Sequence, residues 1–199
     1  ALTDLCIEHG IEDLLLAHHQ NDQAETVLLQ LLRGAGVAGL SGMPLHRTNV
    51  NQGDPITLWR PLLNQSRAEL EAYAKARKLK WVEDPSNQNT RYRRNAIRKE
   101  IIPKLEKIQP GAVINLARSA GLLAQSQALL DRLAKQDGKG ILQGRNLKLA
   151  TLLTLAKADK SAASNLMRYW LKLNGLAMPS QERLESWWKD LLAVKTDSS

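Results

Sequence analysis

The sequence lacks several features that would place it in a secreted or membrane class. It contains no phenylalanine and one cysteine, Cys6, among 199 residues. A single cysteine can form no disulfide within the chain and cannot build a cysteine-rich zinc site. No apolar run approaches the roughly 18 residues that a membrane-spanning helix needs, and the first ten residues lack the pattern of a secretory signal. These absences predict a cytoplasmic protein that does not enter a membrane.

Acidic residues are scarce in the second half of the chain. Residues 1–90 hold 8 Lys and Arg against 11 Asp and Glu, whereas residues 91–199 hold 20 against 9. The basic excess is densest over residues 90–107, where the cations are Arg91, Arg93, Arg94, Arg98, Lys99, Lys104 and Lys107. Such a segment can neutralise several phosphates and favours nucleic-acid binding. A solvated helix face explains the same charges without any ligand.

Short apolar runs alternate with helical patterns in the first half. The runs at 13–17, 56–59 and 80–83 predict strands, and helices are expected over 2–10, about 22–34 and 67–78. The glycine-rich residues 34–42 and the polar residues 46–55 predict loops. Ser66 followed by Glu69 predicts a capping box. This alternation predicts an α/β fold with a partial parallel sheet flanked by helices.

From about residue 92 onward the pattern is mainly helical. Helices are expected over 111–136, 160–174 and 181–194, and residues 147–149 are expected to form a strand or a turn. Trp187 and Trp188 fall on the apolar stripe of the last helix, which favours core packing over stacking on nucleic-acid bases. Pro110 and Gly111 mark the expected boundary between two domains, 1–110 and 111–199.

Two histidines and two carboxylates gather in the stretch AHHQNDQAETVLLQLLRG, residues 17–34. The stretch follows the first expected strand, and ligands of open parallel sheets bind beyond the carboxyl ends of the strands. Asp22 and Glu25 have the spacing of a capping box, which explains them without a ligand. A small-molecule site is the second reading. A metal-dependent hydrolase using His18, His19 and Asp22 is the third, although zinc usually needs more ligands than this spacing supplies.

A second polar stretch, DPSNQNTRYRRNAIR, covers residues 84–98. Its first residues are turn formers. Arg94 and Arg98 lie one helical turn apart and are expected to present two guanidinium groups to phosphate. A basic helix with an N-cap is the alternative that requires no ligand.

These two stretches, together with WRPLL at 59–63, resemble the tRNA(Ile)-lysidine synthase family of N-type ATP pyrophosphatases, whose PP-loop domain is Rossmann-like. The resemblance implies a ligase that uses ATP to adenylate C2 of the wobble cytidine in tRNA(Ile) with a CAU anticodon. The ε-amine of L-lysine then displaces AMP. ATP and Mg²⁺ are the implied cofactors, without identifiable Mg²⁺ ligands. Residues 1–110 would belong to the catalytic, nucleotide-binding domain and residues 111–199 to a helical tRNA-binding domain.

The resemblance also implies roles for individual residues by position. The catalytic set is His18, Asp22, Asn87 and Arg98. Asp22 and Glu25 would bind the lysine, because carboxylates recognise its ammonium group. The residues expected to bind phosphate or tRNA are Arg33, Arg91, Arg93, Arg94 and Lys99. No metal ligand is assigned.

The chain departs from the family pattern in two respects. Asn21 stands where many members have Asp, and the family's Ser-Gly-Gly-x-Asp-Ser loop for the ATP phosphates is absent. We therefore expect a fragment without that loop and without the last C-terminal domain, and expect it to be inactive alone. A non-catalytic RNA-binding module built on the basic segment is the remaining alternative. A homodimer is left open.

Overall fold

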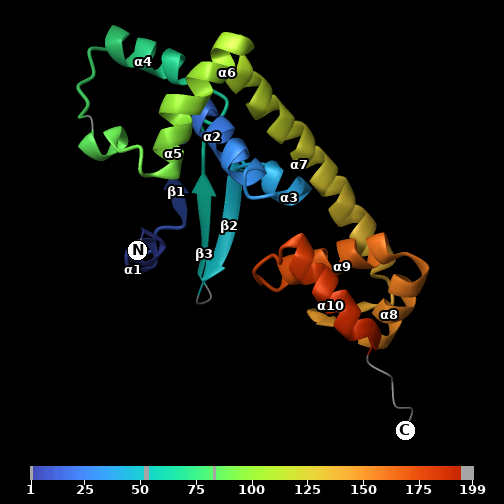
Figure 1. Ribbon diagram of the computed structural model, residues 1–199. Coiled ribbons are helices and arrows are strands. Elements are labelled where there is room, and N and C mark those ends of the chain that lie inside the picture. Colours follow the sequence, from blue (N-terminus) through green and yellow to red (C-terminus); the bar gives the residue numbers. More distant parts are fainter. Residues whose placement is uncertain (1, 52–53, 83, 194–199) are drawn as a thin grey trace. The chain divides into compact units, whose positions relative to one another are not determined.

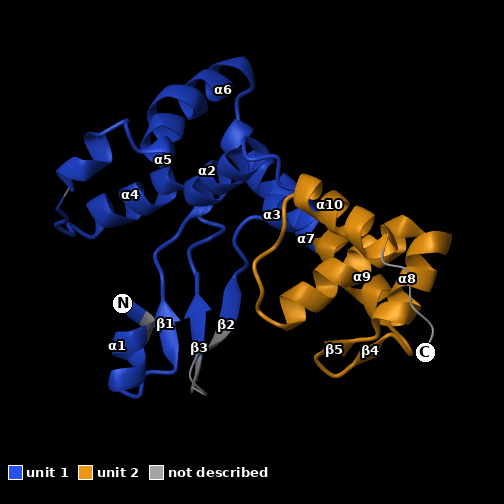
Figure 2. Ribbon diagram, turned by 60° about the horizontal axis from the view of Figure 1, so that its bottom comes forward, with its two compact units in different colours: residues 1–124 blue, residues 125–199 orange. Residues whose placement is uncertain are grey.

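The computed structural model describes residues 2–51, 54–82 and 84–193 (Figure 1). The chain forms two compact units, residues 1–124 and 125–199 (Figure 2). The division falls inside the long helix α7 (Ala112–Asp137). The domain boundary near residue 110 therefore stays a prediction about organisation in the complete protein.

Unit 1 is built on a three-stranded sheet with the order β1-β3-β2, visible in Figure 1. The central strand β3 (Asp54–Trp59) runs parallel to β1 (Asp13–Leu15) and antiparallel to β2 (His46–Asn51). The parallel pair confirms the predicted α/β fold. The loop predicted over residues 46–55 is wrong for residues 46–51 and 54–55, because β2 and β3 pair there, and the hydroxyls of Thr48 and Thr57 lie 3.1 Å apart. Residues 52 and 53 lie outside the described residues. The sequence of β2 is mostly polar and therefore does not indicate a strand, which forms through its backbone pairing with β3.

The strand predicted over residues 80–83 is also wrong for residues 80–82, which form no strand, and residue 83 lies outside the described residues. Trp81 is 54% exposed and Val82 is 95% exposed. The apolar run therefore lies at the surface and not in a sheet.

The helical elements that carry Ala24, Ile97, Ile102 and Val113 pack around a small apolar core formed by these residues. Ser66 and Glu69 form the predicted capping box, since each side chain accepts a backbone N–H of the other residue, at 3.2 and 2.7 Å. A short helix also forms within the predicted glycine-rich loop. The helical elements are α1 (Leu2–Glu8), α2 (Gln20–Leu31), α3 (Val37–Leu40), α4 (Arg67–Ala76), the 3₁₀ turn η1 (Pro85–Gln88), α5 (Arg93–Ala96), the π-turn η2 (Ile97–Ile101) and α6 (Ile102–Ile108).

The described part of unit 2, residues 125–193, is helical with one small hairpin. Its elements after α7 are β4 (Leu142–Gln143), β5 (Asn146–Leu147), α8 (Leu149–Ala158), α9 (Lys160–Leu173) and α10 (Gln181–Ala193). Trp188 is fully buried among Leu152, Leu166 and Leu184, and its Nε1 donates to Ser164 Oγ at 2.8 Å. The prediction of core packing is confirmed for Trp188. Helix α8 was not predicted, because its sequence LATLLTLAKA is apolar on most sides and shows no clear stripe.

Candidate functional site

Glu25 is the centre of a buried ion cluster in unit 1. Its side chain has no exposed surface and accepts three charge-assisted hydrogen bonds. Arg94 Nε donates to Oε2 at 2.8 Å, and Arg98 donates through Nε to Oε1 at 2.6 Å and through Nη2 to Oε2 at 2.9 Å. The hydrogen bond with Glu25 raises the pKa of Arg98 above its ordinary value. The cluster thereby holds α2 against α5 and η2.

Asp22 belongs to the same cluster and also closes the start of α2. Its Oδ1 lies 3.3 Å from Nη2 of both Arg94 and Arg98. Its Oδ2 accepts the backbone N–H of His19 at 3.0 Å. The capping box predicted between Asp22 and Glu25 is therefore wrong. The helix begins at Gln20, its N-cap is His19, and the capping box forms between His19 and Asp22. Glu25 binds the two arginines instead.

The two arginines reach one pair of carboxylates because of their local helix geometry. Arg94 lies on α5 and Arg98 on the π-turn that follows it. A π-turn inserts an extra residue into a helix, and such turns are frequent at functional sites. Both guanidinium groups contact Asp22 and Glu25, and Arg98 also lines a pocket. Their presentation to phosphate stays a prediction.

His18 lies between the carboxyl end of β1 and the start of α2. Its Nδ1 is buried and has no hydrogen-bond partner among the described residues. Burial lowers the pKa of His18 below its ordinary value of 6.5; Asp22 opposes this shift, whereas Arg60 and Arg94 add to it. The imidazole is therefore mainly neutral at pH 7 and able to accept a proton.

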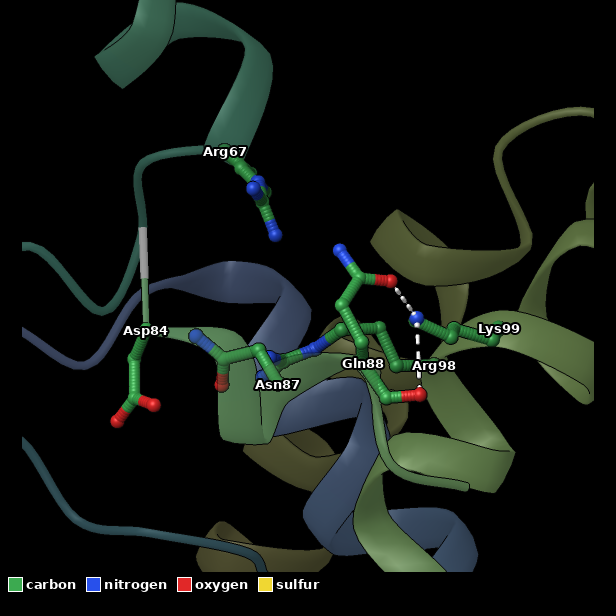
Figure 3. Close-up of a pocket in the computed structure, with 6 residues that line it drawn as sticks. All are labelled: Arg67, Asp84, Asn87, Gln88, Arg98 and Lys99. Atoms are coloured by element: carbon green, nitrogen blue, oxygen red, sulfur yellow. Dashed lines mark hydrogen bonds between the residues drawn. The ribbon is translucent and has the colours of Figure 1, made fainter. Parts of the chain in front are cut away.

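A pocket of about 300 Å³ opens beside the cluster (Figure 3). Its lining residues come from the start of α4, from η1 and its N-cap, and from η2: Arg67, Asp84, Asn87, Gln88, Arg98 and Lys99. The lining holds three cations, of which Arg67 pairs with Glu71 and Arg98 with Glu25, and one carboxylate, that of Asp84. Such an excess of cations suits an anion with several oxygen atoms, such as a phosphate group.

The η1 turn that forms one side of the pocket is held by buried Asn95. Asn95 Nδ2 donates to the carbonyl oxygens of Ser86 at 3.0 Å and Asn89 at 2.9 Å. Asp84 accepts the backbone N–H of Ser86 at 2.8 Å, which lowers the pKa of the Asp84 carboxyl. Lys99 Nζ donates to the carbonyl of Gln88 at 3.3 Å and to its side-chain oxygen (Figure 3). These contacts fix the turn that carries Asn87.

The structure brings together most, but not all, of the residues expected at the site. Asp22, Glu25, Arg94 and Arg98 form one connected group, and His18 lies close enough for Asp22 and Arg94 to influence its pKa. Arg98 connects this group to the pocket that Asn87 and Lys99 also line. The exposed side chains of Arg33, Arg91 and Arg93 do not line this pocket.

Sequence reasoning missed three residues of interest. Arg67 and Gln88 line the pocket, and Arg60 is buried directly after β3, the strand that pairs with β1. Arg67 immediately follows Ser66, the N-cap of α4. The cap indicates where the helix begins, but it does not indicate that Arg67 lines a pocket. Arg60 belongs to the WRPLL motif, which contributed to the family resemblance but suggested no role for this residue.

Neither a metal centre nor a membrane helix is found in the described ranges. Across residues 2–51, 54–82 and 84–193, no three or more His, Cys, Asp or Glu side chains are grouped so as to hold a metal ion. The metal-site reading of His18, His19 and Asp22 therefore has no geometric support. Over the same ranges, no helix has both the length and the apolar character for crossing a bilayer.

Comparison with known proteins assigns a class to this arrangement. Residues 1–105 match the PP-loop domain family, and the chain therefore belongs to that family. Residues 147–199 match the TilS substrate binding domain. The expected Rossmann-like α/β class is confirmed for the first part of the chain.

Several similar curated proteins carry the name tRNA(Ile)-lysidine synthase. The protein of this name from Ralstonia nicotianae is 44% identical over 199 residues, which is 100% of this chain and 41% of the relative. That from Burkholderia pseudomallei is 42% identical over 196 residues, 98% of this chain and 39% of the relative. That from Serratia proteamaculans is 41% identical over 188 residues. The chain spans about two-fifths of the length of these relatives.

Proposed function

We propose that the protein carrying this chain is a tRNA(Ile)-lysidine synthase, a ligase that joins L-lysine to C2 of the wobble cytidine in tRNA(Ile) with a CAU anticodon. The proposal rests on the contact between the two stretches that resemble the family, residues 17–34 and 84–98. Asp22 and Glu25 from the first stretch contact Arg94 and Arg98 from the second, across about 70 residues of sequence. The names of the full-length relatives support the same activity.

Asp22 is the residue best placed to meet the lysine ammonium. Its side chain keeps 13% of its surface exposed, whereas that of Glu25 keeps none. A carboxylate near the surface lowers the cost of bringing a cation close, and the burial of Glu25 suits it to hold Arg94 and Arg98 in place. Direct lysine binding by Glu25 stays a prediction and requires one of these arginines to move.

His18 is suited to the proton transfer that the reaction needs. The lysine amine attacks C2 only after it has lost a proton, and AMP departs as the new carbon–nitrogen bond forms. A neutral imidazole close to Asp22 can accept that proton. The lowered pKa of His18 keeps this form dominant at neutral pH.

The pocket lining fits the phosphate groups of ATP. Arg67, Arg98 and Lys99 would hold phosphate oxygens, and the Asn87 amide would lie among them. When bound, ATP supplies the adenylyl group that activates C2 of the cytidine. Arg98 would stabilise the negative charge that develops on the leaving phosphate. The described residues do not define ligands for Mg²⁺, so its use rests on the family resemblance.

The exposed cations are the proposed contacts of the tRNA backbone. Arg33, Arg91 and Arg93 are exposed, and salt-dependent phosphate contacts need such side chains. Residues 147–199, which match a substrate-binding domain, would add further contacts to the tRNA. A cytoplasmic location follows from the substrate under this proposal, and a homodimer stays a prediction.

Substituting Asp22 separates an enzyme from a plain RNA-binding module. In the protein as its gene encodes it, Asp22→Asn should abolish lysine transfer while tRNA affinity, measured by gel shift, stays within about twofold. Glu12→Gln, which neutralises an exposed carboxylate elsewhere in unit 1, serves as the control and should keep full activity. Lysine transfer that is unaffected by Asp22→Asn would refute the assigned role, and binding of tRNA without any transfer by the wild type would favour the module.

A further inference from the structure

Arg60 is a buried cation to which the activity proposed above assigns no role. It directly follows the last residue of β3 and is 9% exposed. Its Nη1 donates to the carbonyl of Pro44 at 2.9 Å, but its Nε is buried and has no hydrogen-bond partner in the described part of the chain. Leaving a buried charged donor unpaired is costly. A ligand that pairs with this side chain would remove that cost.

No carboxylate of the described residues forms an ion pair with Arg60. Burial lowers the pKa of the Arg60 guanidinium, and the nearby cation Arg47 adds to this effect. The guanidinium nevertheless stays protonated at neutral pH, because an arginine pKa is far above 7. The site therefore offers an uncompensated positive charge.

A second unpartnered polar atom lies at the same edge of the sheet. Leu15 pairs with Trp59 in the parallel β1–β3 ladder, and Leu16 N donates to Trp59 O at 2.8 Å. His18 and Arg60 thus leave the carboxyl ends of two adjacent parallel strands, where ligands of such sheets bind. His18 Nδ1 is buried and unpartnered like Arg60 Nε. Buried polar atoms are nearly always hydrogen-bonded in proteins, so two exceptions at one edge point to a ligand.

We infer that Arg60 binds the α-carboxylate of the amino-acid substrate. The inference rests on the proposed function and adds the recognition of the second end of the lysine. The Nε–Nη2 edge of a guanidinium matches the two oxygens of one carboxylate. The cations suited to phosphate line the separate pocket at η1 and η2, and Arg60 is not among them.

The placement of Asp22 supports this orientation of the substrate. Arg60 and Asp22 both lie close enough to His18 to influence its charge, with opposite signs. Lysine carries a carboxylate at one end and an ammonium at the other. With Arg60 holding the carboxylate, the ε-ammonium extends towards Asp22 and His18, where the proposed proton transfer takes place.

The test compares lysine with cadaverine, which has the same carbon chain and two amines but no carboxylate. The ratio of kcat/KM for lysine to that for cadaverine is measured in the protein as its gene encodes it, with ATP and tRNA saturating. Arg60→Gln should lower this ratio about ten- to a hundredfold, through weaker use of lysine with cadaverine unchanged. Arg60→Lys, which keeps the charge without the fork, should recover part of the ratio. Calorimetric titration of lysine should show a matching loss of affinity.

Arg47→Gln is the matched control. It removes a neighbouring exposed cation from β2 and should leave the ratio unchanged. If Arg60→Gln does not fold, Arg60→Lys carries the test, and an unchanged ratio in that variant overturns the inference.

Three other outcomes are distinguishable. An equal loss on both amines means that Arg60 acts only on the structure and overturns the inference. A raised KM for ATP or tRNA at a constant ratio assigns Arg60 to phosphate, with the same consequence. A wild-type protein that transfers neither amine refutes the proposed function itself.

Discussion

Glu25→Gln removes the central charge of the ion cluster without changing the size of the side chain. The fully buried carboxylate accepts three bonds from Arg94 and Arg98. A glutamine retains one acceptor oxygen, and its amide group is a donor that faces the guanidinium donors. Breaking one partner of a buried ion pair typically costs about 3–5 kcal/mol. Because the Arg94 and Arg98 side chains are 39% and 27% exposed and can regain water, we expect about 2–4 kcal/mol here.

Hydrogen exchange read by mass spectrometry is the appropriate assay, because the two units need not unfold together. Peptides from α2, α5 and η2 should lose protection in Glu25→Gln, whereas those from α9 and α10 should not change. Glu71→Gln breaks the exposed pair with Arg67 and should have a much smaller effect. Unchanged protection of α2 in Glu25→Gln would refute the argument that this cluster joins α2 to η2.

Three further predictions concern the core of unit 2, the pH dependence of stability and the tRNA contacts. Trp188→Ala should cost about 3–5 kcal/mol in urea unfolding of unit 2, because it empties a fully buried site, whereas the exposed Trp81→Ala should leave that transition unchanged. Burial lowers the pKa of His18, so between 6.5 and its lower folded-state pKa the unfolded chain binds a proton that the folded chain does not. Stability should therefore fall as the pH drops through about 6.5 and level off below the folded-state pKa, and His18→Gln should reduce this dependence in unfolding titrations. The double variant Arg91→Gln/Arg93→Gln should weaken tRNA binding and reduce the salt slope of log K by up to about 1.4–1.8 in filter-binding assays.

Each of these predictions can fail separately. Equal effects of Trp188→Ala and Trp81→Ala would contradict the assignment of Trp188 to the core. A pH profile that His18→Gln does not alter would show that His18 has the same pKa in the folded and unfolded chains. An unchanged salt slope would place the tRNA backbone away from residues 91–93.

The sequence predicted those features that local chemistry determines. Ser66 and Glu69 form the expected capping box because both partners lie within one helical turn. Trp188 falls in the core because the spacing of apolar residues on α10 defines a stripe. The stretches around Asp22 and Arg98 indicated a site because polar residues accumulate there beyond the needs of packing.

Features that depend on tertiary pairing could not be predicted. Strand β2 is mostly polar, and the side chains of His46, Arg47 and Thr48 are exposed, so only its ladder with β3 identifies it as a strand. Trp81 and Val82 belong to an apolar run that pairs with no strand among the described residues. The partner of Glu25 lies about 70 residues away, and local spacing therefore suggested a cap where the fold places an ion cluster. Arg60 gave no chemical signal, since its distinguishing property is burial without a partner.

The most direct measurement of the central claim is the transfer of isotope-labelled lysine to tRNA(Ile) with a CAU anticodon. The protein as its gene encodes it is incubated with ATP, Mg²⁺ and this tRNA, and the nucleosides are analysed by mass spectrometry after digestion. We predict that one labelled lysine appears on the wobble cytidine, only when ATP is present, and that Asp22→Asn abolishes it. Unmodified cytidine in the presence of bound tRNA, ATP and lysine would contradict the proposed activity.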